Sequence, residues 1–445
     1  MNSVSPITAY NQKVNFKNLT KPNFKADKEN TIEVKQEKGL SKEAKIATGV
    51  IGALALAGVT YALMRKPSEG KKAVDAVKNE LSQDWKEAME FFNIKQLPEH
   101  IDFKEAKTLE EALQYGKTFL NIEYKAGKYG WNVDAVNFIN RSIVDVSNAM
   151  KGKSYLPKEA TPWLVVSNPE EAAAAIRKNG KTLDVNGLMF IRNGLDKDLK
   201  TIFKWLQKPD ELAEYFDIKA EAEFKKLLEK YTTGNLTYTE KWQFYCTFSE
   251  GIHSPLKNPM NVLKFLSKKY PELKLNIKEL SSKTIEEQKL EMKKIIKKLK
   301  DEGKSITLVV DKCALPYEIT YHELGHNQHC VSDYIVMGIN DRKAFENKHH
   351  DFSLKKGDWD AMHNKGQIQS WHSPILEFFE SKNQTIAREV SNYAATNPAE
   401  FIAETFARKM QGYKFSDKVE ALYKKYNGPE ILNPPPVKEP IWHFE

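Results

Sequence analysis

The chain has 445 residues, 41% apolar and 11% aromatic, which is enough to bury a substantial core and excludes a disordered or fibrous protein. Its three cysteines are too few for a disulfide framework and include no CxxC pair for a thiolate metal site. The formal net charge is +8, but residues 1–45 hold nine lysines against five acidic residues, and Arg65 and Lys66 add two more positive charges. Only about +2 remains elsewhere, so no nucleic-acid partner is expected.

The first 72 residues divide into three segments. Residues 1–45 are rich in lysine and small polar side chains, so we expect a flexible basic tail. Residues 46–64 carry no charge, and as a helix they are long enough to cross roughly 30 Å of hydrocarbon. We therefore expect a single-pass transmembrane helix at 46–64, followed by a polar linker at 65–72.

The apolar segment starts well inside the chain and lacks a clear small-residue cleavage site before Arg65, which makes a cleaved signal peptide the weaker interpretation. Basic residues on its two sides nearly balance, so they do not decide its orientation. We expect a membrane protein with an N-terminal anchor, whose catalytic domain could lie on either side.

Residues 73–430 predict one helix-rich α+β domain, with a helical N-terminal part and insertions. Apolar residues at helical spacing predict helices, and short continuous apolar runs predict strands. The run Pro434–Pro436 predicts a proline-rich tail at 431–445. The expected helices are Val74–Phe92, Val133–Met150, Thr284–Leu299 and a short one at Ala172–Ala175, and the expected strands are Trp163–Val166, Leu188–Arg192 and Ile306–Val310.

An HExxH motif runs from His322 to His326. Histidines four residues apart lie on one face of a helix, within reach of one cation, and neutral imidazole nitrogens suit Zn²⁺. Glu323 lies beside them, where it can take a proton from zinc-bound water without being a ligand. The motif predicts a catalytic zinc site that needs a third protein ligand. His329, three residues further on, is expected to have a structural role or to orient a ligand.

A separate helix is predicted to supply the third ligand. The metzincin pattern fails, because the glycine and histidine that it requires after His326 are absent. A downstream helix is predicted with Asn397 as its N-cap and Pro398 as its first residue, and it carries Glu400 and Glu404 on one face. Its other side chains are largely apolar, and acids on a partly buried face are costly unless they are paired or bind a metal.

The two motifs together resemble the lethal-factor-like zincin peptidases, the family of the anthrax lethal factor catalytic domain. There, an HExxH helix is followed by a tyrosine, six residues, and then Glu, two aromatic or aliphatic residues, Ala and Glu; Tyr393 and Glu400 to Glu404 match this pattern. The resemblance covers about residues 306–410 and implies a zincin-like, gluzincin-type domain with a small mixed sheet and one zinc ion. It implies that Glu400 is the third ligand, that Glu404 orients a ligand histidine, and that Tyr393 donates its hydroxyl to the oxyanion.

These features predict a membrane-anchored zinc metalloendopeptidase in which Glu323 is the general base. In zincin folds the strand before the metal helix lies at the sheet edge, so Ile306–Val310 is expected to pair with an extended peptide or protein substrate. The alternative is a non-catalytic, membrane-tethered binding module with the same fold. Four histidines between the motifs are alternatives to Glu400 as the third ligand: His349, His350, His363 and His372.

Overall fold

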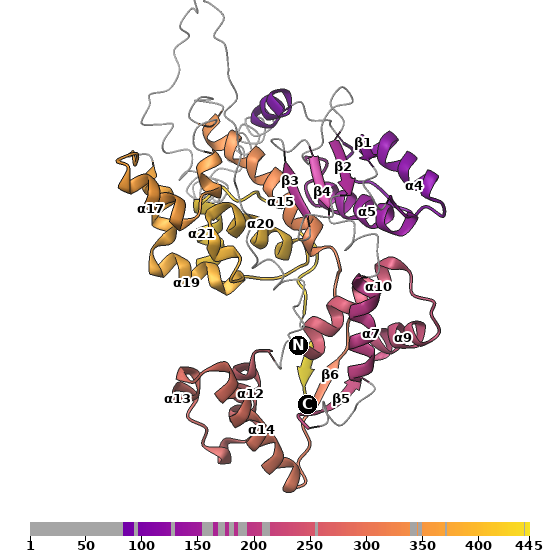
Figure 1. The fold of residues 1–445 in the computed structure, drawn as a ribbon, viewed down its shortest axis with the longest axis vertical. Helices are drawn as coiled ribbons and strands as arrows, with labels where there is room; N and C mark the ends of the chain where they lie inside the picture. The colour runs from indigo at the N-terminus through magenta and orange to yellow at the C-terminus, as the bar shows by residue number, and fades with distance from the viewer. Residues whose placement is uncertain are drawn as a thin grey trace, which may run out of the picture.

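The computed structural model shows a helix-rich α+β protein (Figure 1). It describes residues 83–92, 97–125, 130–153, 163–167, 174–177, 182–185, 194–206, 214–253, 257–338, 345, 349–369, 372–439 and 441–445. The expected tail, transmembrane helix and linker of residues 1–72 lie outside these ranges. Within them, no helix is both long and apolar enough to cross a bilayer.

Four short strands form a mixed sheet in the order β1-β2-β4-β3. Strands β1 (Ile122–Lys125), β2 (Trp163–Ser167) and β4 (Thr182–Val185) are parallel to one another, and α5 (Val133–Ala149) lies between β1 and β2 in the chain. The edge strand β3 (Ala174–Arg177) is antiparallel to β4. The strand expected to begin at Trp163 and the helix expected to begin at Val133 are confirmed.

The short helix expected at Ala172–Ala175 is wrong. Residues 174–177 are strand β3, in which Ala174 pairs with Val185 and Arg177 pairs with Thr182. Ladder hydrogen bonds to β4 outweigh the helix propensity of a few alanines, which is a weak preference that tertiary context often overrides. The expected strand Leu188–Arg192 lies outside the described residues.

A second sheet has three strands, with β6 (Thr307–Val310) in the centre. β6 is parallel to β5 (Asp217–Ala220) on one side and antiparallel to β7 (Trp442–Phe444) on the other. The strand expected at Ile306–Val310 is therefore confirmed, but its expected place at a sheet edge is wrong. Both of its sides are already hydrogen-bonded to neighbouring strands, so β6 has no edge to offer a substrate.

The last residues belong to the folded domain and do not form the proline-rich tail expected at 431–445. Strand β7 pairs with β6, and the Phe444 ring centroid lies 5.5 Å from that of Phe216 and 4.9 Å from that of Phe265. The prolines at 434–436 lie in the connection that leads to β7. Burial of the aromatic side chains explains why the chain returns to the core after these prolines.

Helices make up most of the described structure. The helix expected at Thr284–Leu299 is confirmed as α14 (Ile285–Asp301), which packs with α12 (Pro259–Lys269) and α13 (Ile277–Ser282) in the unit at the lower left of Figure 1. Residues 83–92 are helical, as expected for the end of Val74–Phe92. The other helices away from the two motifs are α4 (Leu109–Tyr115), α7 (Gly194–Leu206), α9 (Ala222–Thr232), α10 (Tyr238–Thr247), α17 (Lys356–Asn364), α18 (Ser373–Leu376), α19 (Ser381–Val390) and α21 (Asp417–Lys425).

The two motifs lie on helices that pack side by side, α15 (Glu318–Asp333) and α20 (Pro398–Lys409). Helix α15 also lies next to the edge strand β3 and buries Leu324 in the core that it shares with α5 (Figure 1). Helix α20 contributes to that core and also buries Phe401 and Ile402 in a second core, formed with α19 and α21. The candidate site therefore lies where two cores meet.

Candidate metal centre

Gly325, inside the HExxH motif, lies at a close contact between α15 and α20. A Cβ atom added to it would lie 3.1 Å from the Cα of Ala403, 3.1 Å from Cδ1 of Phe406 and 3.3 Å from the carbonyl oxygen of Ala403. These distances are tighter than ordinary carbon contacts, which lie at about 3.5–4.0 Å. The small residues Gly325 and Ala403 thus allow the two helices to approach closely and bring side chains from both to one point.

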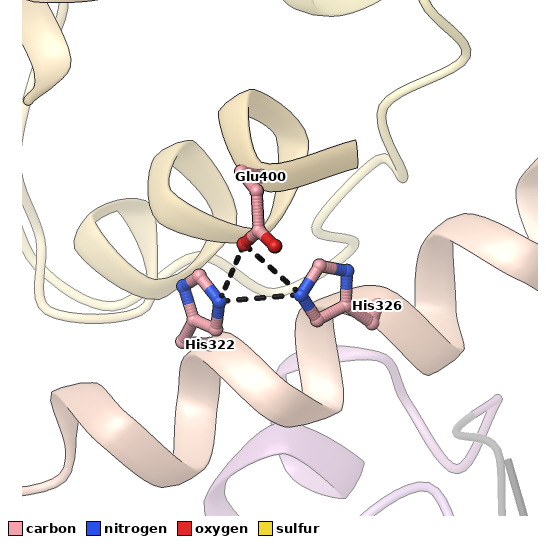
Figure 2. A group of neighbouring side chains, drawn as sticks. All are labelled: His322, His326 and Glu400. Atoms are coloured by element: carbon pink, nitrogen blue, oxygen red, sulfur yellow. Dashed lines mark hydrogen bonds and ion pairs between the residues drawn. The ribbon is translucent and has the colours of Figure 1, made fainter. Parts of the chain in front are cut away.

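Three side chains converge at this point, two from α15 and one from α20 (Figure 2). The Nε2 atoms of His322 and His326 are 3.2 Å apart. Oε2 of Glu400 lies 3.1 Å from Nε2 of His322 and 3.4 Å from Nε2 of His326. Asn397 starts α20 by accepting a hydrogen bond from the Glu400 backbone N–H, at 2.8 Å, so the cap fixes the turn that carries the carboxylate.

These donor atoms fit a zinc ion. Ligand atoms about 2.1 Å from a tetrahedral zinc lie about 3.4 Å from one another, close to all three distances here. Oε2 of Glu400 is buried and has no hydrogen-bond partner within the described ranges, although both imidazoles are near it. Two imidazole nitrogens and one carboxylate oxygen are a ligand set of catalytic zinc sites. Among the described residues, no other group of three or more His, Cys, Asp or Glu residues has ligand atoms gathered this closely.

Two carboxylates, Glu400 and Glu404, dominate the electrostatics of this site. Burial lowers the pKa of His322, but the nearby carboxylates of Glu400 and Glu404 outweigh it and raise this pKa well above its usual range. Burial raises the pKa of Glu400, but His326 and His322 together hold it well below its usual range. The two buried carboxylates thus place negative charge beside the histidines, which a bound cation would balance in place of the imidazole protons.

Glu404 contacts Nδ1 of His322, the ring nitrogen that does not face Glu400. Its Oε1 lies 2.9 Å from Nδ1 of His322, and its Oε2 accepts a hydrogen bond of 2.7 Å from the Ser391 hydroxyl. Burial raises the pKa of Glu404, but the hydrogen bond and attraction of His322 lower it overall. A carboxylate at Nδ1 orients the ring so that Nε2 faces Glu400, which is how such partners direct metal-binding histidines.

Glu323 and Tyr393 complete the predicted set. Glu323 is buried and lies on α15 between the two histidines. Tyr393 is half-buried, and its ring centroid is 5.8 Å from that of His322, with the ring planes 40° apart. Contacts thus join Tyr393, Glu400 and Glu404 to the HExxH helix, although more than sixty residues separate Tyr393 from His326.

The other histidines lie outside this group. Nε2 of His329 is 2.9 Å from the carbonyl oxygen of Tyr426, so His329 fits the expected structural role. Nδ1 of His349 is 2.9 Å from Oδ2 of Asp333, and Nε2 of His372 is 3.5 Å from Oδ2 of Asp351. The remaining two histidines between the motifs, His350 and His363, have side chains at or near the protein surface.

Sequence reasoning missed the residues that support the ligands, including Gly325, Ser391 and Arg408. Arg408 follows Glu404 by one helical turn, a spacing that could have indicated it, whereas no local pattern marks Ser391. Searches of protein-family models, of curated proteins and of solved structures find no match to this chain.

Proposed function

We propose that this chain is a zinc-dependent metalloendopeptidase with a zincin-like domain, held at a membrane by residues 46–64. The observation that carries the proposal is the convergence of His322, His326 and Glu400 at distances of 3.1 to 3.4 Å, with Glu323 on the same helix. Two histidines and a carboxylate leave one position of a tetrahedral zinc site open, as catalysis requires.

Zinc at this site would act as a Lewis acid toward water and a substrate carbonyl. Glu323 is the general base, which removes the proton from the attacking water and then passes it to the leaving amine. Tyr393 donates its hydroxyl to the carbonyl oxygen as negative charge develops there. Glu404 keeps His322 in the orientation that binding requires.

The substrate is an extended peptide or an unfolded segment of a protein, paired with strand β3. β3 ends its sheet and lies next to α15, which makes it the candidate for the role that the sequence assigned to Ile306–Val310 (Figure 1). Addition of a strand to a sheet edge supplies main-chain hydrogen bonds that do not depend on side-chain identity.

Zinc content and hydrolysis, measured on the same preparations, test the proposal. The purified chain should contain about one zinc ion, and H326A and E400A should lose it. E323Q should keep zinc but lose cleavage of fluorescently labelled, denatured casein by at least about a hundredfold. H363A is the matched control, because His363 is exposed and lies outside the ligand group, and it should resemble the parent.

Two outcomes would count against the proposal. A folded parent without zinc would exclude the metal centre. A zinc-loaded parent that cleaves no better than E323Q would instead support a non-catalytic binding module.

A further inference from the structure

Arg408 lies on α20, the helix that carries Glu400 and Glu404, and is not itself one of the three candidate ligands. Its Nη2 atom is 3.3 Å from Oε1 of Glu318, in the first turn of α15, and its side chain is only 19% exposed. It lies one helical turn after Glu404 and is attracted by both Glu318 and Glu404. Arg408 is therefore a mostly buried cation that connects the two motif helices.

The other charged residues near Glu318 include a carboxylate and a lysine that pair with each other. The next carboxylate, Glu250, is 2.7 Å from Nζ of Lys438 and accepts a hydrogen bond of 2.9 Å from the Tyr413 hydroxyl. Glu318 pairs with Arg408 at 3.3 Å and is also attracted by Lys438, although no ion pair within 4 Å joins Glu318 to Lys438 among the described residues. Carboxylates in a partly buried site are costly unless an opposite charge lies close to them.

The connection bears on the ligands because they come from different helices. His322 and His326 move with α15, whereas Glu400 moves with α20, so their spacing depends on how the helices are held together. Gly325 and Ala403 set how closely the helices approach, but an apolar contact only weakly restrains sliding along the helix axis. The ion pair between Arg408 on α20 and Glu318 on α15 restrains that sliding, because its attraction weakens as the charged groups separate.

We propose that Arg408 is a positioning residue for the metal centre: its contact with Glu318 fixes α15 against α20, and its charge holds Glu404 beside His322. The inference rests on the proposed function, because it requires that the three ligand atoms bind a cation. Arg408 does not touch the ligand atoms, and its effect on the metal passes through Glu318 and Glu404.

The test compares zinc affinities of the full chain and its variants, measured by competition with a chromophoric chelator. R408Q should bind zinc about tenfold more weakly than the parent, the lower end of the range for loss of an outer partner of a metal ligand. E318Q should weaken binding as well, by no more than R408Q does, and R408Q/E318Q should be no more than about twofold weaker than R408Q, because R408Q already removes the contact with Glu318. The matched control is K409Q, which removes the neighbouring charge of α20, where Lys409 pairs with Glu420 at 2.7 Å, and should bind zinc like the parent.

A general loss of folding is recognised separately, because it would broaden the visible spectrum of the Co²⁺-loaded variants. If R408Q does not fold, E318Q carries the test, since it leaves the arginine in place. Parent-like zinc affinity in both single variants, or equal weakening in K409Q, would overturn the inference. Absence of zinc from the folded parent would overturn the proposed function as well, so the two failures are distinguishable.

Discussion

Replacement of Gly325 with alanine tests the close contact between α15 and α20. The added methyl group would meet Ala403 and Phe406 at 3.1 Å, so α20 must shift by a few tenths of an ångström. Overpacking of this kind costs roughly 1–3 kcal/mol, while alanine in place of glycine inside a helix contributes up to about 1 kcal/mol of stability. We expect a net destabilisation of roughly 0–3 kcal/mol. Because Glu400 moves with α20, we also expect weaker zinc binding.

Gly357 provides the control for this prediction. It lies in α17, and a Cβ atom added there would meet nothing within 4 Å, so G357A gains helix propensity without a clash. Denaturant unfolding of both variants should therefore show G325A less stable than G357A by roughly 1–3 kcal/mol, which isolates the contact with α20. Equal stability of the two variants, together with parent-like zinc affinity in G325A, would refute the close approach of the helices.

Three further predictions concern groups near α15. E404Q should weaken zinc binding about 10- to 100-fold in chelator competition, because an amide holds the His322 ring less firmly than a carboxylate, and an unchanged affinity would contradict the contact. Burial is the main cause that lowers the pKa of His329 to about 3, below its unfolded value near 6.5, so the stability of the protein should fall as pH drops from 6.5 to 3. The free energy of unfolding of H329Q should depend less on pH over this interval, and the same pH dependence in H329Q and the parent would exclude the effect. Burial raises the pKa of Cys246 well above its usual range and that of Cys313 to about 12, so iodoacetamide near pH 8 should label Cys330 first, as read by mass spectrometry; prior labelling of Cys246 would contradict its burial.

The site could be predicted from the sequence because its geometry is largely local. Helical periodicity places His322 and His326 on one face, and the cap at Asn397 fixes the helix that presents Glu400 and Glu404. The sequence could not reveal how the two helices pack, because that depends on Gly325 meeting Ala403 across a gap of more than seventy residues.

The sheets were harder to predict because strand neighbours are non-local. β6 has the apolar pattern of a buried strand, but its central position depends on β5 and β7, which lie far away in the sequence. β3 contains alanines, and only its pairing with β4 makes it a strand. Pattern alone therefore identified β6 as a strand but could not show which strand forms the edge beside α15.

The long separation between His326 and Glu400 is compatible with a metal site because the intervening residues form a core of their own. The ring centroid of Phe378, which lies in this segment, is 5.9 Å from that of Phe401 on α20 and 5.5 Å from that of Tyr426. This second core supports the face of α20 opposite α15, while Phe406 packs into the core on the α15 side. Glu400 is therefore held by packing on both sides of its helix, so the long segment between the two motifs adds to the rigidity that the proposed three-ligand site needs.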